Sequence, residues 1–182
     1  MQKILETKEK YTEKIKKILI TEEQIQARVS ELGAQISHDY TGKNPLFIGL
    51  LRGCFVFMSD IIRKITLPCT VDFLEVSSYN NSMVSSRVVN ITKDLREDVK
   101  GRDVVIIDDI TDSGLTLSKV CGILRERAPN SLKICTLLDK PCRRETELSP
   151  DYVGFTVGGE FVVGYGLDYA GLYRNLGYIG CI

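Results

Sequence analysis

Short apolar runs alternate with amphipathic stretches along most of the chain. Thr21 opens a capping box with Gln24, and apolar residues recur at helical spacing from Ile25 to Ile36. This pattern predicts an amphipathic helix over residues 22–40 that packs on a sheet. The preceding residues are rich in Lys and Glu, and Lys17–Ile20 is either part of a frayed lead-in or an edge strand.

Beyond this helix, apolar runs of strand length alternate with helical segments. Such an alternation predicts an α/β fold with a mostly parallel, twisted sheet flanked by helices. Open sheets of this kind bind ligands beyond the carboxyl ends of their strands, so the residues after each apolar run are the first candidates for a site. The expected strands are 46–51, 71–76, 104–107, 132–138, 152–157 and 161–165, and the expected helices among them are 55–65 and 115–127.

Length and charge narrow the possibilities. The 182 residues fit one domain, and 24 Lys and Arg against 24 Asp and Glu give no basic excess for nucleic acid. No apolar run approaches the about 18 residues of a membrane span, and the charged N-terminus is not a secretory signal. We therefore expect a cytoplasmic location, with neither nucleic acid nor membrane as a partner.

The six cysteines form no CxxC pair, and the single histidine, His38, cannot complete a zinc pattern with them. Most of them lie in or beside apolar runs, where a buried free thiol is the common structure. We expect all six to be reduced rather than paired in disulfides.

The stretch after the predicted strand 104–107 carries the candidate chemistry. A helix N-terminus follows it, and the unpaired N–H groups there can hold a phosphate, which Gly114 would allow to approach closely. Ser113 and Thr116 can add hydroxyl donors, while Asp108 and Asp109 suit sugar hydroxyls or a divalent cation. The combination points to a phosphorylated sugar, although Asp and Ser are also the ordinary residues of a helix N-cap.

The full stretch from Val104 to Leu117, VVIIDDITDSGLTL, resembles the phosphoribosyl pyrophosphate signature of type I phosphoribosyltransferases. From about residue 21 onward the chain resembles the purine branch of that family, the hypoxanthine-guanine phosphoribosyltransferases, and especially its short bacterial members. The further matching motifs, in order, are Ile48–Gly53, Ser77–Tyr79 continuing through Thr92–Leu95, Leu137–Pro141, Glu160–Tyr169 and Tyr173–Leu176.

The resemblance implies the type I phosphoribosyltransferase fold in a single domain. It implies a core over about 40–150 and a small hood from about 1–25 and 150–182. A mobile lid over about 77–94 would include Ser78 and Tyr79. It also implies a homodimer or homotetramer.

The resemblance further implies transfer of the 5-phosphoribosyl group from phosphoribosyl pyrophosphate to hypoxanthine or guanine, with Mg²⁺ as cofactor. Asp112 is the implied general base. Asp108 and Asp109 are implied to contact the ribose diol and the hydration shell of the metal. Asp168 is implied to coordinate Mg²⁺ itself. The implied substrate contacts are Leu51, Arg52, Gly53 and Arg174 for pyrophosphate, Asp112, Ser113, Gly114, Leu115 and Thr116 for the 5′-phosphate, and Lys140, Phe161 and Val162 for the purine. In this family the Leu51–Arg52 peptide can be cis.

Alternatives stay open at this point. Gly158-Gly159 stands where the family frequently has a Pro-Asp pair, so a xanthine-preferring enzyme is possible. A regulator that binds phosphoribosyl pyrophosphate without catalysis is a second class, although no DNA-binding helix pair is appended. A receiver-type signalling domain also uses an acidic pair after a strand. It would need a further aspartate after its central strand and an acidic pair near its first strand, whereas the strand 46–51 ends in Arg-Gly.

Overall fold

A six-stranded sheet forms the centre of the computed structural model, which describes residues 12–78 and 89–182. Its strand order is β4-β3-β2-β5-β6-β7, and every neighbouring pair is parallel except β3 and β4. The predicted α/β class with a mostly parallel sheet is therefore confirmed. The strands are β2 (Leu46–Leu51), β3 (Thr70–Ser78), β4 (Val89–Lys93), β5 (Asp103–Thr111), β6 (Ser131–Asp139) and β7 (Tyr152–Thr156).

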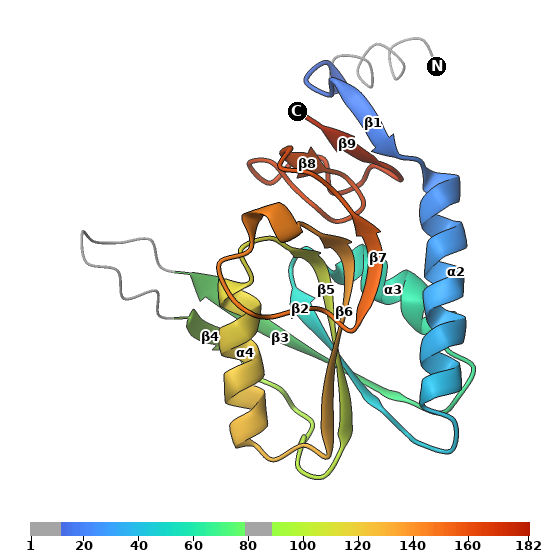
Figure 1. Cartoon of the computed structure of the whole chain (residues 1–182), viewed down its shortest axis with the longest axis vertical. Coiled ribbons are helices and arrows are strands. Elements are labelled where there is room, and N and C mark those ends of the chain that lie inside the picture. The colour runs from blue at the N-terminus through green and yellow to red at the C-terminus, as the bar shows by residue number, and fades with distance from the viewer. Residues whose placement is uncertain (1–11, 79–88) are drawn as a thin grey trace, which may run out of the picture.

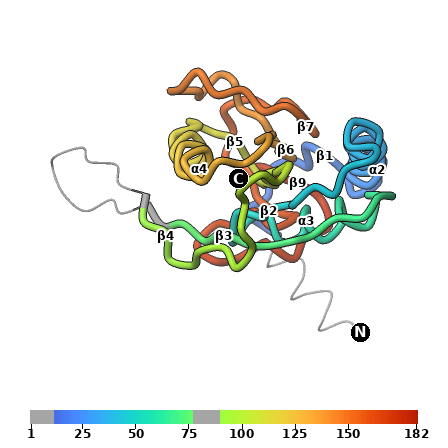
Figure 2. Tube along the Cα trace, turned by 90° about the horizontal axis from the view of Figure 1, so that it is seen from below, coloured from blue at the N-terminus to red at the C-terminus, as the bar shows by residue number. Residues whose placement is uncertain are grey.

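Helices cover both faces of this sheet. Helices α2 (Glu22–Asp39) and α3 (Phe55–Ile62) lie on one side and α4 (Leu115–Glu126) on the other (Figures 1 and 2). Two separate clusters of buried side chains confirm the division, one under α2 and α3 and the other under α4. Because both faces are covered, the central strands are apolar almost throughout, as in β2.

The capping box at the start of α2 is confirmed. The Gln24 amide donates to Thr21 Oγ1 at 3.3 Å, and the Thr21 amide donates to Gln24 Oε1 at 2.9 Å. Helix α3 ends at Ile62, three residues before its predicted end. The amides of Lys64 and Ile65 bond three residues back, to Ile61 and Ile62, and this tighter turn closes the helix.

A second, smaller sheet consists of β1 (Lys17–Ile20), β9 (Ile179–Cys181) and β8 (Val162–Val163), all antiparallel. It lies above the six-stranded sheet in Figure 1, near both ends of the described chain. The edge strand at Lys17–Ile20 is thus confirmed. The predicted strand over 161–165 is wrong beyond Val163, because Gly164 and Tyr165 have φ values of 99° and 49° and leave the extended region.

Two expected boundaries also differ. Strand β7 pairs with β6, so residues 152–156 belong to the large sheet and not to the expected hood segment 150–182. In the expected lid segment 77–94, Val89–Lys93 is a strand that returns beside β3, and Asp94 is paired with Arg127 at 2.8 and 2.9 Å. The lid residue Tyr79 and the side chain of Ser78 lie outside the described part of the chain.

No helix in residues 12–78 and 89–182 is long and apolar enough to cross a membrane. All six cysteines are free, in agreement with the expected thiols.

Candidate active site

The acidic pair lies on a strand and not in the predicted loop after it. Strand β5 continues to Thr111, four residues past the apolar run, because it keeps pairing with β6 through Asp108↔Thr136 and Thr111↔Asp139. Backbone hydrogen bonds sustain this pairing whatever the side chains are, so the apolar pattern could not mark its end. Asp108 and Asp109 thereby occupy the carboxyl end of the central strand, where ligands bind in such sheets.

Burial dominates the electrostatics of this pair. Removal from water raises the pKa of Asp108 well above its usual range, and the charge of Asp109 raises it further. Burial also raises the pKa of Asp109, although the Arg174 guanidinium acts in the opposite direction. Two half-buried carboxyls with raised pKa values favour a ligand that brings a cation or hydroxyl donors.

The loop between β5 and α4 is shaped to receive an anion. Gly114 is the N-cap residue of α4 with φ 79° and has no side chain to cap the helix. Asp112 does not serve as the ordinary helix cap that its position also allowed, and the Leu115 amide donates to Ser113 Oγ at 3.4 Å. A cavity of about 110 Å³ opens here, and its lining is Asp108, Ile110, Thr111, Asp112, Ser113, Gly114, Thr116 and Leu117.

Two polar atoms in this lining have no hydrogen-bond partner among the described residues. They are the hydroxyl of Thr111 and Oδ1 of Asp112. The guanidinium Nε of Arg143 lies 3.2 Å from Asp112 Oδ1, close enough for an ion pair but not aligned as a hydrogen bond. A buried polar atom without a hydrogen-bond partner is costly, so the Thr111 hydroxyl is available for a bound molecule, whereas Asp112 Oδ1 already faces the charge of Arg143.

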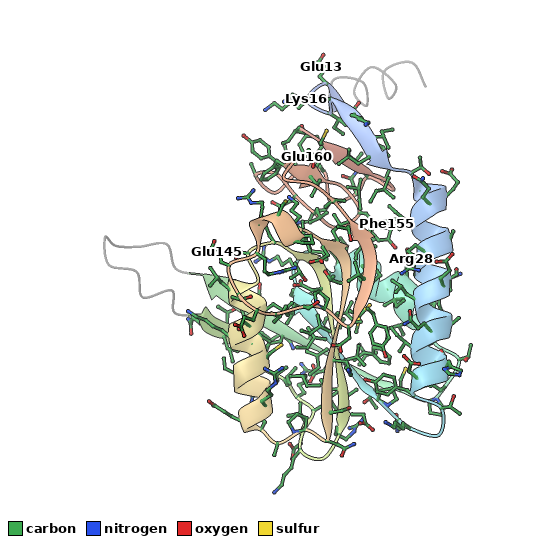
Figure 3. All side chains as sticks on the ribbon, in the orientation of Figure 1. Glu13, Lys16, Arg28, Glu145, Phe155 and Glu160 are labelled. Carbon is green, nitrogen blue, oxygen red and sulfur yellow. The ribbon has the colours of Figure 1, made fainter. Side chains whose placement is uncertain are left out.

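The segment after β6 supports this loop from one side, and the sequence did not reveal it. The Arg144 guanidinium pairs with the Asp139 carboxylate, both nearly buried, and also donates to the Asp112 carbonyl at 3.2 Å. The Glu145 amide donates to the Ser113 carbonyl at 2.9 Å, and Figure 3 shows Glu145 beside the upper end of α4. The ion-pair partner of Arg144, Asp139, is only five residues away in the sequence, but the second partner, the Asp112 carbonyl, is a backbone atom 32 residues earlier that no residue pattern marks.

Lys140 follows β6 and is only 3% exposed, so it is not the solvated surface charge that a lysine after a strand usually is. Its Nζ donates to the Glu160 carbonyl at 2.6 Å. Glu160 lies at the smaller sheet, two residues before β8 (Figure 3). The amide of Lys140 donates to the Thr111 carbonyl at 3.0 Å, which keeps it beside the anion loop.

Two predicted purine contacts come from the start of β8. Val162 is buried, whereas the Phe161 side chain is 51% exposed and meets the Tyr169 ring edge-on at 5.7 Å. An aromatic face that is half exposed beside a buried amine is a suitable surface for a flat heterocycle.

Asp168 and Arg174 form one unit. Arg174 Nη2 lies 2.6 Å from Asp168 Oδ1, and Nη1 donates to the Gly166 carbonyl at 2.6 Å. The second carboxylate oxygen of Asp168 accepts from the Gly171 amide at 2.8 Å. The structure thus places the predicted metal ligand and the predicted pyrophosphate arginine in direct contact.

The loop after β2 contributes the remaining predicted residues. The Leu51–Arg52 peptide is cis, as the resemblance allowed. Arg52 is exposed, with Nε 3.3 Å from Glu75 Oε1 on the neighbouring strand. Gly53 packs so closely on Asp109 that a Cβ at this position would lie 1.7 Å from the carboxylate, so the loop can reach the acidic pair only with glycine here.

Over the described parts of the chain, no three His, Cys, Asp or Glu side chains converge as metal ligands. Asp108, Asp109 and Asp168 therefore do not form a complete set of protein ligands around a metal. The donors still fit Mg²⁺, which is usually held by one or two carboxylates together with waters and substrate phosphates. The raised pKa values of the acidic pair point in the same direction, because a nearby cation would favour the ionised carboxylates.

Comparisons with known proteins agree with this geometry. A family model described as the phosphoribosyl transferase domain matches residues 18–170. The chain is 54% identical to the hypoxanthine phosphoribosyltransferase of Haemophilus influenzae over 90% of its own length and 93% of that protein. It is also 54% identical to the hypoxanthine-guanine phosphoribosyltransferase of Bacillus subtilis, over 92% of this chain and 93% of the relative.

A solved structure of a hypoxanthine phosphoribosyltransferase from Staphylococcus aureus superimposes with a TM-score of 0.90 at 48% identity, over 93% of this chain and 92% of that one. The fold and the site define the class of enzymes that transfer a phosphorylated sugar. The chain belongs to the phosphoribosyltransferase family. The receiver-type alternative is thereby excluded.

The buried acidic pair yields a prediction about stability. Folding raises the pKa of Asp108 above its unfolded value of about 3.9, so the folded state loses stability as pH rises from the unfolded pKa to the folded pKa, and the loss stays constant above it. Asp108→Asn should therefore raise the melting temperature near neutral pH by roughly 2–4 °C, the shift expected for about 1 kcal/mol at this size. The gain should vanish below about pH 4, where the carboxyl is protonated in both states. Asp98→Asn, at an exposed carboxylate, is the control. If Asp108→Asn did not raise the melting temperature, or raised it only as much as Asp98→Asn does, the interpretation would be contradicted.

Proposed function

We propose that the chain is a purine salvage enzyme that transfers the 5-phosphoribosyl group from phosphoribosyl pyrophosphate to hypoxanthine or guanine and releases pyrophosphate. The observation that carries the proposal is the meeting of an uncapped helix start, a buried acidic pair and the Asp168–Arg174 pair at one edge of the sheet. The names of the relatives from H. influenzae and B. subtilis support the same reaction.

In this proposal the sugar phosphate lies across the end of β5. The backbone from Asp112 to Thr116, with the hydroxyls of Ser113 and Thr116, holds the 5′-phosphate at the start of α4. Asp108 and Asp109 accept from the ribose hydroxyls. The positive end of the helix and the two carboxylates therefore bind opposite parts of one molecule.

The purine lies between Phe161 and the end of β6. The buried ammonium of Lys140 donates to the 6-oxo group, and this contact selects oxopurines because the 6-amino group of adenine offers no acceptor there. Val162 contacts the base through its backbone. The carboxylate of Asp112, which makes no hydrogen bond through Oδ1 but is ion-paired with Arg143, is the general base that accepts the imidazole proton as the new bond forms.

The pyrophosphate end faces the Arg52-Gly53 backbone, Leu51 and Arg174. Asp168 is the residue we assign to Mg²⁺, with Asp108 and Asp109 contacting its hydration shell. Mg²⁺ supplies, when bound, positive charge that offsets the negative charge developing on the leaving pyrophosphate. Holding both substrates in line contributes on the order of 7–11 kcal/mol at best toward lowering the barrier.

The remaining assignments are proposals of the same kind. Residues 1–182 act as one domain in the cytoplasm as a homodimer or homotetramer, and the part of the expected lid that lies between β3 and β4 closes over the site. A preference for xanthine and a non-catalytic regulator are the alternatives. Retention of Asp112, Lys140 and the Asp168–Arg174 pair favours catalysis over regulation.

Turnover is tested with hypoxanthine, guanine, xanthine and adenine in parallel, each with phosphoribosyl pyrophosphate and Mg²⁺. We expect the mononucleotide from hypoxanthine or guanine and none from adenine, measured by nucleotide absorbance and released pyrophosphate. Fastest turnover with xanthine would support the xanthine alternative, and no turnover with any 6-oxopurine would reject the enzyme.

The role of Asp112 is tested with Asp112→Asn, which keeps the shape of the side chain but cannot accept the proton. General base catalysis contributes about 10²–10⁴-fold, so kcat should fall within that range. The KM for phosphoribosyl pyrophosphate should change little, because the loop backbone and not this carboxylate holds the phosphate. Unchanged kcat in a steady-state assay would remove Asp112 from the base role.

The anion loop is tested with Gly114→Ala. The added Cβ would meet Thr146 Oγ1 at 2.6 Å while φ is 79°, so the loop has to move. Gly101→Ala is the matched control, since its φ is 69° but nothing lies within 4 Å of the added Cβ. Both variants should lose about 1–2 kcal/mol of stability to left-handed strain, but only Gly114→Ala should raise the KM for phosphoribosyl pyrophosphate. An equal KM in both variants would show that this loop does not hold the phosphate.

A further inference from the structure

A buried carboxylate on α3 lies outside the set of residues assigned to substrates. The Oδ2 atom of Asp60 accepts from the Tyr165 hydroxyl at 2.5 Å and from Gln26 Nε2 at 2.8 Å, and Oδ1 pairs with Arg63. Burial acts to raise the pKa of Asp60, but the donors from Tyr165, Gln26 and Arg63 outweigh it and lower the pKa. Asp60 is therefore an ionised, well-satisfied anchor that joins α2, α3 and the loop containing Tyr165.

Tyr165 belongs to the loop that presents Asp168 and Arg174. Its side chain is only 2% exposed, its φ is 49°, and its amide donates to the Leu176 carbonyl at 2.8 Å. The next amide, of Gly166, donates to the Arg174 carbonyl at 2.9 Å, and the Gly166 carbonyl accepts from the Arg174 guanidinium. The position of Tyr165 therefore fixes the backbone to which the guanidinium of Arg174 is bound.

This loop also touches the loop on the opposite side of the pyrophosphate region. Gly166 has φ 100°, and a Cβ there would lie 2.2 Å from the Gly53 carbonyl oxygen. Gly53 lies one residue before Cys54, the N-cap residue of α3, and Asp60 lies in the second turn of the same helix. Helix α3 thus begins at one loop and holds the other through the Asp60–Tyr165 hydrogen bond.

We propose that the Asp60–Tyr165 hydrogen bond positions the Asp168–Arg174 pair against the Arg52-Gly53 loop and so sets the affinity for the pyrophosphate end of the sugar substrate. Tyr165 and Asp60 are positioning residues and contact no substrate themselves. The inference rests on the proposed function, because it assumes that these two loops bind pyrophosphate. Of the proposed purine contacts, Lys140 follows β6 and Val162 belongs to β8, whereas Phe161 touches this loop through the edge of the Tyr169 ring.

Tyr165→Phe tests the proposal because it removes one hydroxyl and keeps the ring. Tyr152→Phe is the matched control. Its hydroxyl also donates to an aspartate, Asp39, at 2.9 Å, and it is nearly as buried, but it lies at the amino end of β7, away from the carboxyl ends that form the site. Both variants should fold and lose similar melting temperature.

Only Tyr165→Phe should weaken binding at the pyrophosphate end. We expect its KM for phosphoribosyl pyrophosphate and its calorimetric Kd for pyrophosphate with Mg²⁺ to rise about tenfold, less than the about 100-fold that a misplacement of 1 Å costs. The KM for the purine should stay the same. Asp60→Asn should weaken pyrophosphate binding too, and the double variant should lose less than the sum of the single losses, because both changes remove the same hydrogen bond.

Tyr165→Phe with unchanged pyrophosphate affinity, or with equal losses for pyrophosphate and purine, would overturn the positioning role. Additive losses in the double variant would overturn it as well. Failure of the proposed function is distinguishable, because it appears in the parent protein as absent turnover or absent pyrophosphate binding before any variant is compared.

Discussion

The pairing of β5 with β6 past the apolar core is the interaction on which the site depends. It carries Asp108 and Asp109 to the edge of the sheet and sets Thr111 opposite Asp139. From there the Lys140 amide bonds to the Thr111 carbonyl, and Arg144 joins Asp139 to the Asp112 carbonyl. A few backbone bonds at the end of one strand pair thus bring the purine lysine and the anion loop together.

This placement has an electrostatic cost that the molecule does not fully offset by itself. The two adjacent carboxyls are removed from water, and Arg174 is the cation that opposes the shift of Asp109. The overall charge of zero hides this separation, because cations and carboxylates gather at one edge of the sheet. A ligand that brings hydroxyl donors or a cation to these carboxyls would stabilise the folded chain, because it binds the folded state and not the unfolded one.

The sequence predicted the elements whose cause is local. The capping box of Thr21 with Gln24 fixed the start of α2, and the apolar runs located the central strands. It also predicted the anion loop, because a glycine and hydroxyl residues before a helix carry their own physical reason. It failed where the cause is a distant partner. The extension of β5 depends on pairing with β6. The early end of β8 depends on the left-handed backbone at Gly164, which packs on the Tyr178 carbonyl, and the contact of Arg144 with the loop before α4 depends on the distant Asp112 carbonyl.

Glycines lie where distant parts of the chain come into close contact. Gly53 meets Asp109, and Gly166 meets Gly53, at distances that leave no room for a Cβ. Gly53 meets the side chain of Asp109 on β5, whereas Gly166 meets the backbone of Gly53 directly, and backbone deforms less easily than a side chain. A change in the loop of Gly53 should therefore be transmitted to the loop of Gly166, and the reverse. Helix α3 is the common base of these two loops, so its packing against α2 controls the geometry of the site although neither helix contributes a residue that we assign to a substrate.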